Sequence, residues 1–234
     1  MLRPGSDILG ELRYLAFGRV IPAVLYLGLL WAILRRFLDG IGRLGPSQTP
    51  YSIITGPVSS GLYVLFIAIP VAIYITRPRP KARDGRIVAR IAAFVATTML
   101  LFAGSPFGGG PVLVTPPAVH AIAALALAGA YALEVYALLY LRLSFSIIPE
   151  ARRLVRGGPY RMVRHPLYSA EIVGAMGVVF ADSSGPHLWS MGILIPFIAL
   201  QLLRSVYEER LLRATFTEYA EYAAHTARLI PFVL

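Results

Sequence analysis

The sequence contains no cysteine and a single lysine, and only 15% of its 234 residues are charged. The lack of cysteine excludes disulfides, thiolate metal ligands and a cysteine nucleophile. The low charge argues against a soluble domain, which needs about a quarter of its residues charged to cover its surface. Apolar residues dominate instead and make up 57% of the chain.

The apolar residues gather in long runs. Residues 57–76 contain no charge, and neither do residues 91–118. A helix needs about 20 apolar residues to cross the ~30 Å hydrocarbon layer of a bilayer. The sequence therefore predicts an all-α, polytopic integral membrane protein with about six transmembrane helices and a cytoplasmic C-terminal helix. The predicted spans are residues 15–38, 57–76, 87–104, 119–141, 166–182 and 187–206.

The net charge of +10 comes largely from arginines in the short loops between these runs. Residues 77–90 and 142–164 are rich in arginine, whereas the Gly/Pro-rich residues 104–118 carry no charge. Basic loops stay on the cytoplasmic side, so both termini are predicted to be cytoplasmic. Because topology explains the basic excess, no nucleic-acid partner is expected. The preference for arginine over lysine suggests a GC-rich genome and hence a bacterial inner membrane.

Two polar clusters flank the fifth and sixth predicted spans, at residues 156–168 and 204–210. The turn between these spans, residues 182–186, is short enough for a helical hairpin, so both clusters are expected at one membrane face. Pro166 suits the first turn of a helix, which places an extended His165 beside a helix N-terminus that attracts anions.

The second cluster, residues 204–210, begins a helix at the end of the sixth predicted span. Arg204 and Glu208 are four residues apart and share a helix face, where they could form a simple salt bridge. In the first cluster, Gly157 and Gly158 are expected to let the backbone approach a ligand closely.

Together the two clusters resemble the isoprenylcysteine carboxyl methyltransferase family, whose broader relatives include membrane phospholipid N-methyltransferases. The matching elements are Gly158-Pro-Tyr160, Arg164-His-Pro-Leu-Tyr168, Glu208-Glu209, and Tyr219-Ala-Glu-Tyr222 followed by Pro231. The resemblance covers about residues 140–234. We therefore assign residues 119–234 to a methyltransferase-like core and residues 1–118, which carry no matching motif, to an amino-terminal part.

The resemblance implies methyl transfer from S-adenosylmethionine (SAM), with the site at the cytoplasmic face and an acceptor that enters from the bilayer. The leading reaction is carboxyl O-methylation of a lipophilic, isoprenoid-like acceptor or a lipidated one, whose carboxylate Arg204 would contact as the catalytic residue. Glu150 is a further candidate for cofactor contact, and no metal is expected. The implied cofactor-binding residues are Leu154, Val155, Tyr160, His165, Pro166, Leu167, Tyr168 and Glu208.

Three other functions stay open: N-methylation of an amine on a phospholipid headgroup, an NADPH-dependent sterol-type reductase, and a non-catalytic membrane binding protein. N-methylation would leave Arg204 without a role in binding the acceptor, because an amine needs an acidic partner. Glu134 lies in the middle of the fourth predicted span, where it could line an acceptor path or pair with an arginine. Gly174 and Gly177 are predicted to permit close helix packing.

Overall fold

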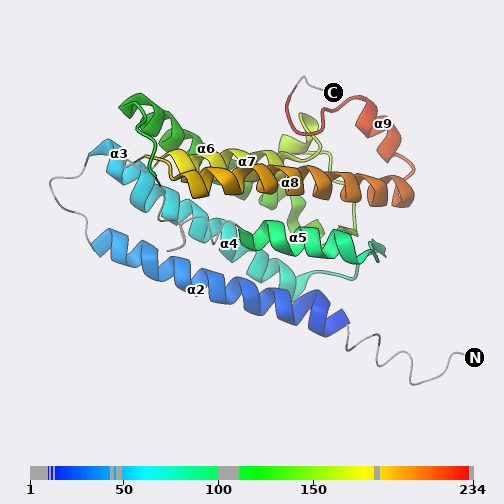
Figure 1. Cartoon of the computed structure of the whole chain (residues 1–234). Helices are drawn as coiled ribbons and strands as arrows, with labels where there is room; N and C mark the ends of the chain where they lie inside the picture. Colours follow the sequence, from blue (N-terminus) through cyan, green and yellow to red (C-terminus); the bar gives the residue numbers. More distant parts are fainter. Residues whose placement is uncertain are drawn as a thin grey trace, which may run out of the picture.

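The computed structural model describes residues 10, 12, 14–42, 45, 49–99, 111–181 and 185–231. Helices account for most of this part of the chain, as Figure 1 shows. A short π-helix, Ala16–Val20, leads into α2, and α3, a second π-helix (Ile54–Val58) and α4 follow one another without a break. The main helices are α2 (Ile21–Gly42), α3 (Pro50–Ile53), α4 (Ser59–Thr76), α5 (Ile87–Met99), α6 (Pro117–Leu141), α7 (Pro166–Phe180), α8 (Leu188–Thr215) and α9 (Tyr219–Ala224).

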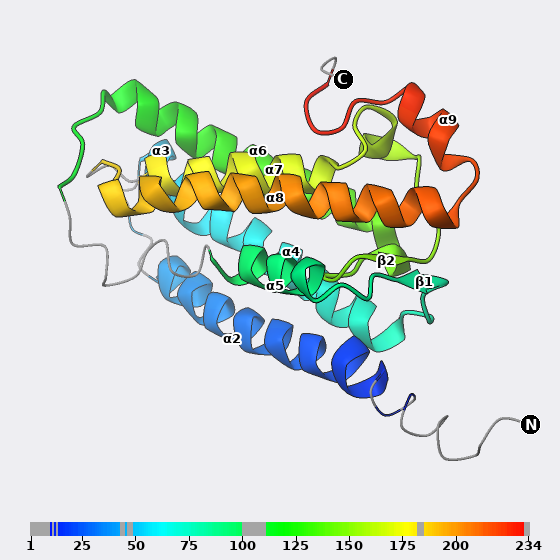
Figure 2. The same cartoon turned by 45° about the vertical axis from the view of Figure 1, so that its right-hand side comes forward.

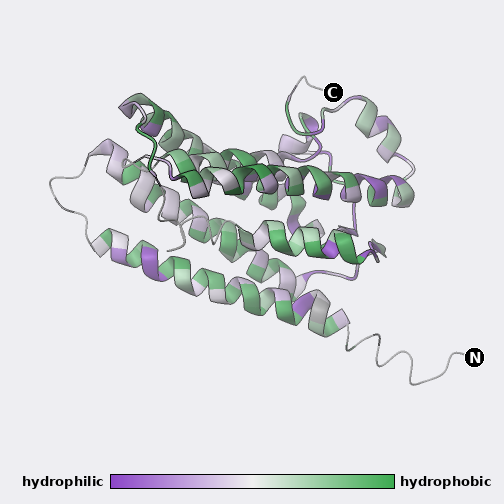
Figure 3. Cartoon of the chain, viewed as in Figure 1, coloured by the Kyte–Doolittle hydropathy of each residue, from purple (hydrophilic) through white to green (hydrophobic). Residues whose placement is uncertain are grey.

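Four helical stretches in the described ranges are long and apolar enough to cross a membrane, and α5 and α7 are shorter apolar helices. Hydrophobic residues cover much of their length in Figure 3. The predicted all-α, polytopic membrane fold is thereby confirmed. The four long stretches are Gly18–Gly42, Pro50–Thr76, Pro117–Ser144 and Leu188–Thr215.

Helix ends differ from the predicted spans where capping or helix continuity overrides hydropathy. The second span begins at Pro50 because the Thr49 side chain accepts a hydrogen bond from the Ser52 backbone N–H and closes a capping box. The last span does not end at residue 206, because α8 continues to Thr215 before Phe216 turns to extended backbone. The predicted cytoplasmic helix is thus the end of α8 together with α9. Residues 100–104 of the third predicted span lie outside the described residues.

Close helix packing surrounds α7. A Cβ added to Gly177 would lie 2.7 Å from the Leu127 Cβ of α6, so glycine is needed there and the prediction for this residue is confirmed. The helix also packs against α8, so the predicted hairpin forms, although residues 182–184 of its turn lie outside the described residues. Further contacts complete the bundle, in which α2 packs on α4, α4 on α6, and α5 on α8 (Figures 1 and 2).

The two arginine-rich loops meet at one end of the helical bundle. Strand β1 (Ala82–Arg83) comes from the first loop and β2 (Glu150–Ala151) from the second, and they pair antiparallel with Arg83 opposite Glu150. In Figure 2 this pair lies at the same end of the molecule as α9 and the beginning of α2. Both basic loops therefore lie on the same side, as the predicted topology requires.

Candidate active site

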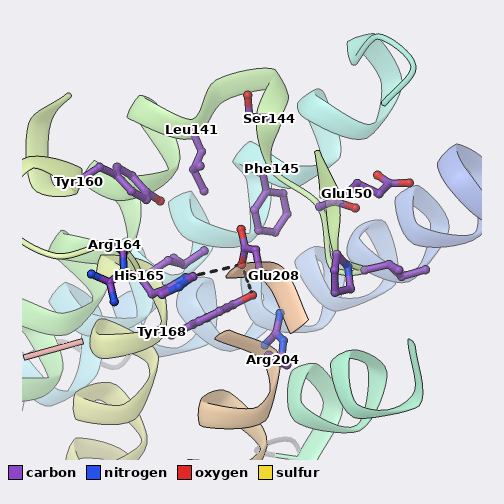
Figure 4. Close-up of a pocket in the computed structure, with 14 residues that line it drawn as sticks. Leu141, Ser144, Phe145, Glu150, Tyr160, Arg164, His165, Tyr168, Arg204 and Glu208 are labelled. Atoms are coloured by element: carbon purple, nitrogen blue, oxygen red, sulfur yellow. Dashed lines mark hydrogen bonds and ion pairs between the residues drawn. The ribbon is translucent and has the colours of Figure 1, made fainter. Parts of the chain in front are cut away.

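A pocket lies at this end of the bundle, where the start of α7 faces α8 and the loop before β2 (Figure 4). Residues from both polar clusters line it, so segments 40 residues apart in the sequence meet here. The lining residues are Leu141, Ser144, Phe145, Ser146, Ile148, Pro149, Glu150, Tyr160, Arg164, His165, Leu167, Tyr168, Arg204 and Glu208.

The beginning of α7 is fixed by the carboxy-terminal segment. His165 has φ −127° and ψ 60°, outside the helical region, and Pro166 follows as the first helical residue. The His165 backbone N–H donates to the carbonyl of Arg228 at 3.0 Å, and that of Arg164 to the carbonyl of Ala227 at 2.8 Å. The chain after α9 therefore holds His165 at the mouth of α7.

Glu208 presents a carboxylate to the pocket. The Tyr168 hydroxyl donates to its Oε2 at 2.9 Å, and the Nδ1 of His165 lies 3.7 Å from the same oxygen. The rings of His165 and Tyr168 stack, with centroids 5.4 Å apart and 9° between their planes. The Glu208 side chain remains 30% exposed, so a ligand in the pocket can reach it.

Glu209, the next residue, is held away from the pocket by three side chains. Arg164 Nε donates to it at 2.8 Å and Arg228 Nη2 at 2.9 Å, and His165 Nε2 lies 3.3 Å from its Oε1. Its side chain is only 4% exposed. Glu209 thus joins the start of α7 to α8 and to the carboxy-terminal segment.

Arg204 is buried at the floor of the pocket. Its guanidinium lies over the Tyr168 ring at 4.7 Å, and its Nη1 donates to Gln201 Oε1 at 2.8 Å. The same nitrogen is 3.5 Å from Glu171 Oε2, which also accepts a hydrogen bond from the Gln201 amide. Within the described residues Arg204 forms its ion pair with Glu171, and the simple Arg204–Glu208 salt bridge is not found.

The sequence analysis did not single out Glu171 and Gln201. A signal for Glu171 existed, because it is an ionisable residue within a predicted span and lies three residues after Tyr168, on the same helix face. Gln201 carries no comparable signal, since only the packing of α7 on α8 brings it to Glu171.

Two buried donors at the pocket lack partners. Among the residues that the structure describes, neither the Tyr160 hydroxyl nor the Arg204 Nε has a hydrogen-bond partner. Burial raises the pKa of Tyr160 well above its usual value, so its hydroxyl stays protonated and can donate. A buried polar group without a partner costs free energy, which a ligand with acceptor atoms would recover.

The structure brings most of the predicted site residues together. Tyr160, His165, Leu167, Tyr168, Arg204 and Glu208 line the pocket. Leu154 packs instead on the cluster around Phe216 and Tyr219, Val155 packs on the main apolar core, and Pro166 is fully buried in the first turn of α7. The roles that the resemblance gives these residues stay predictions.

Gly158 packs closely against α6. It has φ +58°, and an added Cβ would lie 2.6 Å from the ring of Tyr140, so the close approach is to this ring. The backbone conformation itself favours glycine. The approach of a ligand to the backbone at Gly157 and Gly158 stays a prediction.

The two other candidate carboxylates differ in their surroundings. Glu150 lines the pocket, but Arg77, Arg83 and Arg152 bind its carboxylate, with Arg83 Nε and Arg152 Nη2 both at 2.7 Å. Glu134 is buried against Gly174, its Oε2 has no hydrogen-bond partner, and no ion pair to an arginine is found for it in the described part of the chain. The alternative in which Glu134 pairs with an arginine is therefore not realised there.

Comparison with known proteins identifies the segment that carries this site. Residues 118–219 match the model of the family described as phospholipid methyltransferase. Two curated relatives are each 32% identical: the cobalt-zinc-cadmium resistance protein CzcN of Cupriavidus metallidurans, over 78 residues, and the nickel-cobalt-cadmium resistance protein NccN of Alcaligenes xylosoxydans xylosoxydans, over 82.

These alignments cover 33% and 35% of this chain, and 35% and 38% of the relatives. The chain thus spans little more than a third of the length of the curated relatives that it matches. The match covers a little under half of the chain and agrees with the resemblance to membrane methyltransferases.

Proposed function

We propose that this chain, whose residues 118–219 match the phospholipid methyltransferase family, transfers a methyl group from SAM to the carboxylate of a lipophilic, isoprenoid-like acceptor. The observation that carries the proposal is the convergence of Tyr160, Arg204 and Glu208 on one pocket within the matched segment. We further propose that the acceptor enters from the bilayer and that the pocket faces the cytoplasm of a bacterial inner membrane.

The polar groups of the pocket suit SAM, which combines a cation, an amino acid group, ribose hydroxyls and an aromatic base. Glu208 would accept hydrogen bonds and offset positive charge, and the Tyr160 hydroxyl would donate to an acceptor atom. The stacked rings of His165 and Tyr168 offer an aromatic surface. When bound, SAM supplies a methyl group already activated on its sulfonium, so the protein must mainly bind and orient the two reactants. Such positioning can supply about 7–11 kcal/mol.

Arg204 would hold the carboxylate of the acceptor. Gln201, Glu171 and the Tyr168 ring fix its guanidinium, so little side-chain freedom remains to be lost on binding. Its Nε has no hydrogen-bond partner among the described residues and can donate to an anion. Because the guanidinium is buried, such a charge-assisted hydrogen bond is stronger than it would be in water.

A second candidate acceptor is the amine of a phospholipid headgroup. Glu171 favours it, because its carboxylate lies beside Arg204, and an amine needs an acidic partner of this kind. The description of the matched family also names a phospholipid. The same pocket would then use Glu171 to hold the acceptor and Arg204 to hold Glu171.

Cofactor binding is tested by calorimetric titration of SAM and of NADPH into the detergent-purified protein. We expect SAM to bind and NADPH not to bind. Tyr160→Phe should weaken SAM binding about 3- to 10-fold, since it removes one neutral hydrogen bond. Tyr219→Phe is the matched control, because its hydroxyl is also buried without a partner in the described residues but lies outside the pocket. NADPH binding in place of SAM would support the reductase.

The acceptor is tested with SAM labelled in its methyl group, offered together with prenylated carboxylates or with aminophospholipids. We expect a labelled methyl ester, and we expect Arg204→Gln to lower its formation at least about 100-fold while SAM affinity changes less than about 3-fold. Labelled phospholipid amine would identify the second candidate instead. SAM binding without a product from either acceptor class would contradict catalysis on both and favour a binding protein.

A further inference from the structure

Gln201 of α8 lies between the two charged groups at the floor of the pocket. Its side-chain oxygen accepts a hydrogen bond from Arg204 Nη1 at 2.8 Å, and its side-chain nitrogen donates to Glu171 Oε2. An arginine can only donate and a carboxylate can only accept, so these two partners fix which end of the amide faces each of them. Gln201 is buried, which shields both hydrogen bonds from bulk water. The amide therefore bridges Arg204 and Glu171 in a single orientation.

The ion pair between Arg204 and Glu171 is longer than a direct hydrogen bond. Arg204 Nη1 lies 3.5 Å from Glu171 Oε2, whereas Arg164 Nε lies 2.8 Å from Glu209 Oε1 in another buried pair of this protein. Charge-assisted hydrogen bonds between such groups span about 2.7–2.9 Å. The Gln201 amide engages the same nitrogen and the same oxygen that a closed pair would join, so it holds the pair open.

Arg204 keeps donor capacity because this pair stays open. Its Nε is buried and has no hydrogen-bond partner among the described residues. Its guanidinium lies over the ring of Tyr168 at 4.7 Å, at the floor of the pocket (Figure 4). A closed, bidentate pair would engage two guanidinium nitrogens with Glu171 and offset the positive charge that attracts an anion. The bridging amide thus determines how much of Arg204 is left for a ligand.

We propose that Gln201 is a positioning residue that keeps Arg204 from closing onto Glu171 and thereby selects an anionic acceptor. The inference rests on the proposed function, in which Arg204 holds the carboxylate of the acceptor. Without the amide, the buried guanidinium and the buried carboxylate each lose a partner, and a direct ion pair is the contact that satisfies both. Arg204 is then engaged by Glu171, and the pocket loses its preference for a negative charge.

The test measures binding and not turnover, in detergent-purified protein without SAM. A prenylated carboxylate and the corresponding neutral carboxamide are titrated by calorimetry, and the ratio of their dissociation constants reports the preference for charge. We expect wild type to bind the carboxylate at least about 10-fold more tightly, as one charge-assisted hydrogen bond provides. Gln201→Met keeps the length of the side chain and removes both hydrogen bonds, so the two affinities should then agree within about 2-fold.

A second substitution separates positioning from damage to the fold. In Gln201→Met/Glu171→Gln, Arg204 has no carboxylate to close onto, so we expect the preference to return to at least about 10-fold. A merely structural role of Gln201 predicts no rescue, because the double variant loses more contacts than the single one. Ser205→Ala is the control: it removes another buried hydrogen bond of α8, from Ser205 Oγ to the Leu202 carbonyl at 2.7 Å, and should keep the wild-type ratio.

Three results would overturn the inference: a wild type that does not distinguish the two ligands, an equal loss of preference in Gln201→Met and Ser205→Ala, or a folded double variant without rescue. Unfolding temperatures show whether each variant is folded, and the comparison of Gln201→Met with Ser205→Ala is decisive without the double variant. The proposed methyl transfer is judged separately, by product formation. A charge preference that responds to Gln201 without any methyl ester product would refute the reaction and leave this inference standing.

Discussion

Glu209 and Glu150 are each bound by arginines, yet the two groups differ in how completely their hydrogen-bonding atoms are paired. Around Glu209 stand Arg164, Arg228 and His165, and both oxygens of the carboxylate accept hydrogen bonds from arginines. Around Glu150, Arg77 and Arg152 each retain a buried donor without a partner in the described part of the chain. The carboxylate of Glu209 thus forms a closed network with its partners, whereas some donors around Glu150 are left without a partner among the described residues.

Glu208 and Glu209 are adjacent in α8 but have different surroundings. Successive helix residues point about 100° apart, so Glu208 and Glu209 of α8 cannot face the same side. Arg164, His165 and Arg228 bind Glu209, and of these two neighbours only Glu208 lines the pocket. Under the proposed function, Glu209 would stabilise the fold and Glu208 would bind the ligand.

Removing the Glu209 carboxylate from its network of ion pairs should have the largest effect on stability. Glu209→Ala leaves the buried Arg164 without its carboxylate, and loss of one partner of a buried ion pair costs roughly 3–5 kcal/mol. We expect the free energy of unfolding in mixed micelles to fall by about 3 kcal/mol, because Arg228 is partly exposed and can be rehydrated. Glu208→Ala is the control and should cost about 1 kcal/mol. Equal losses in the two variants would remove the distinction between these residues.

A substitution at Gly158, which lies between Glu150 and Arg164 in the sequence, should have the next largest effect on stability. Gly158→Ala forces a left-handed alanine, which costs about 1–2 kcal/mol, and brings its Cβ against the Tyr140 ring. We expect a loss of about 2 kcal/mol in the same unfolding measurement. Gly157→Ala is matched, since its φ is −93° and its added Cβ would lie at 3.4 Å from that ring. A smaller loss for Gly158→Ala than for Gly157→Ala would contradict the packing.

The smallest expected effect concerns pH. Burial alone would raise the pKa of Glu150, but Arg152, Arg77 and Arg83 lower it below the usual value of 4.5. A lowered pKa in the folded state means that the ionised carboxylate stabilises the protein above about pH 4.5 and that this stabilisation is lost as pH falls further. The difference in unfolding temperature between wild type and Glu150→Gln should therefore shrink below that pH. A constant difference would contradict the ion pairs.

Hydropathy predicted the four long helices well because an apolar run that crosses the hydrocarbon must reach a minimum length. It could not predict that α8 continues to Thr215, since a helix that leaves the membrane no longer needs apolar residues. The early start at Pro50 depends on the side chains of Thr49 and Ser52, a local signal that a search for apolar runs passes over.

The sequence predicted the site residues that are close together in the chain. It did not predict those that only tertiary packing brings to the pocket. The residues from Arg164 to Tyr168 form a compact run, and the hairpin topology brings them to Glu208. Phe145, Ser146 and Ile148 also line the pocket, but they come from a loop whose position depends on the pairing of β1 with β2. The partners of Glu209 likewise depend on the fold of the chain after α9.

The most direct test of the account is the SAM affinity of Glu208→Gln, measured by calorimetry beside wild type. The substitution keeps the size of the side chain and removes its charge, and hydrogen bonds to charged groups are worth about 1.5–3 kcal/mol. We predict SAM binding that is about 10- to 100-fold weaker, with an unfolding temperature close to that of wild type. Unchanged SAM affinity in the folded variant would contradict the assignment of this pocket to the methyl donor.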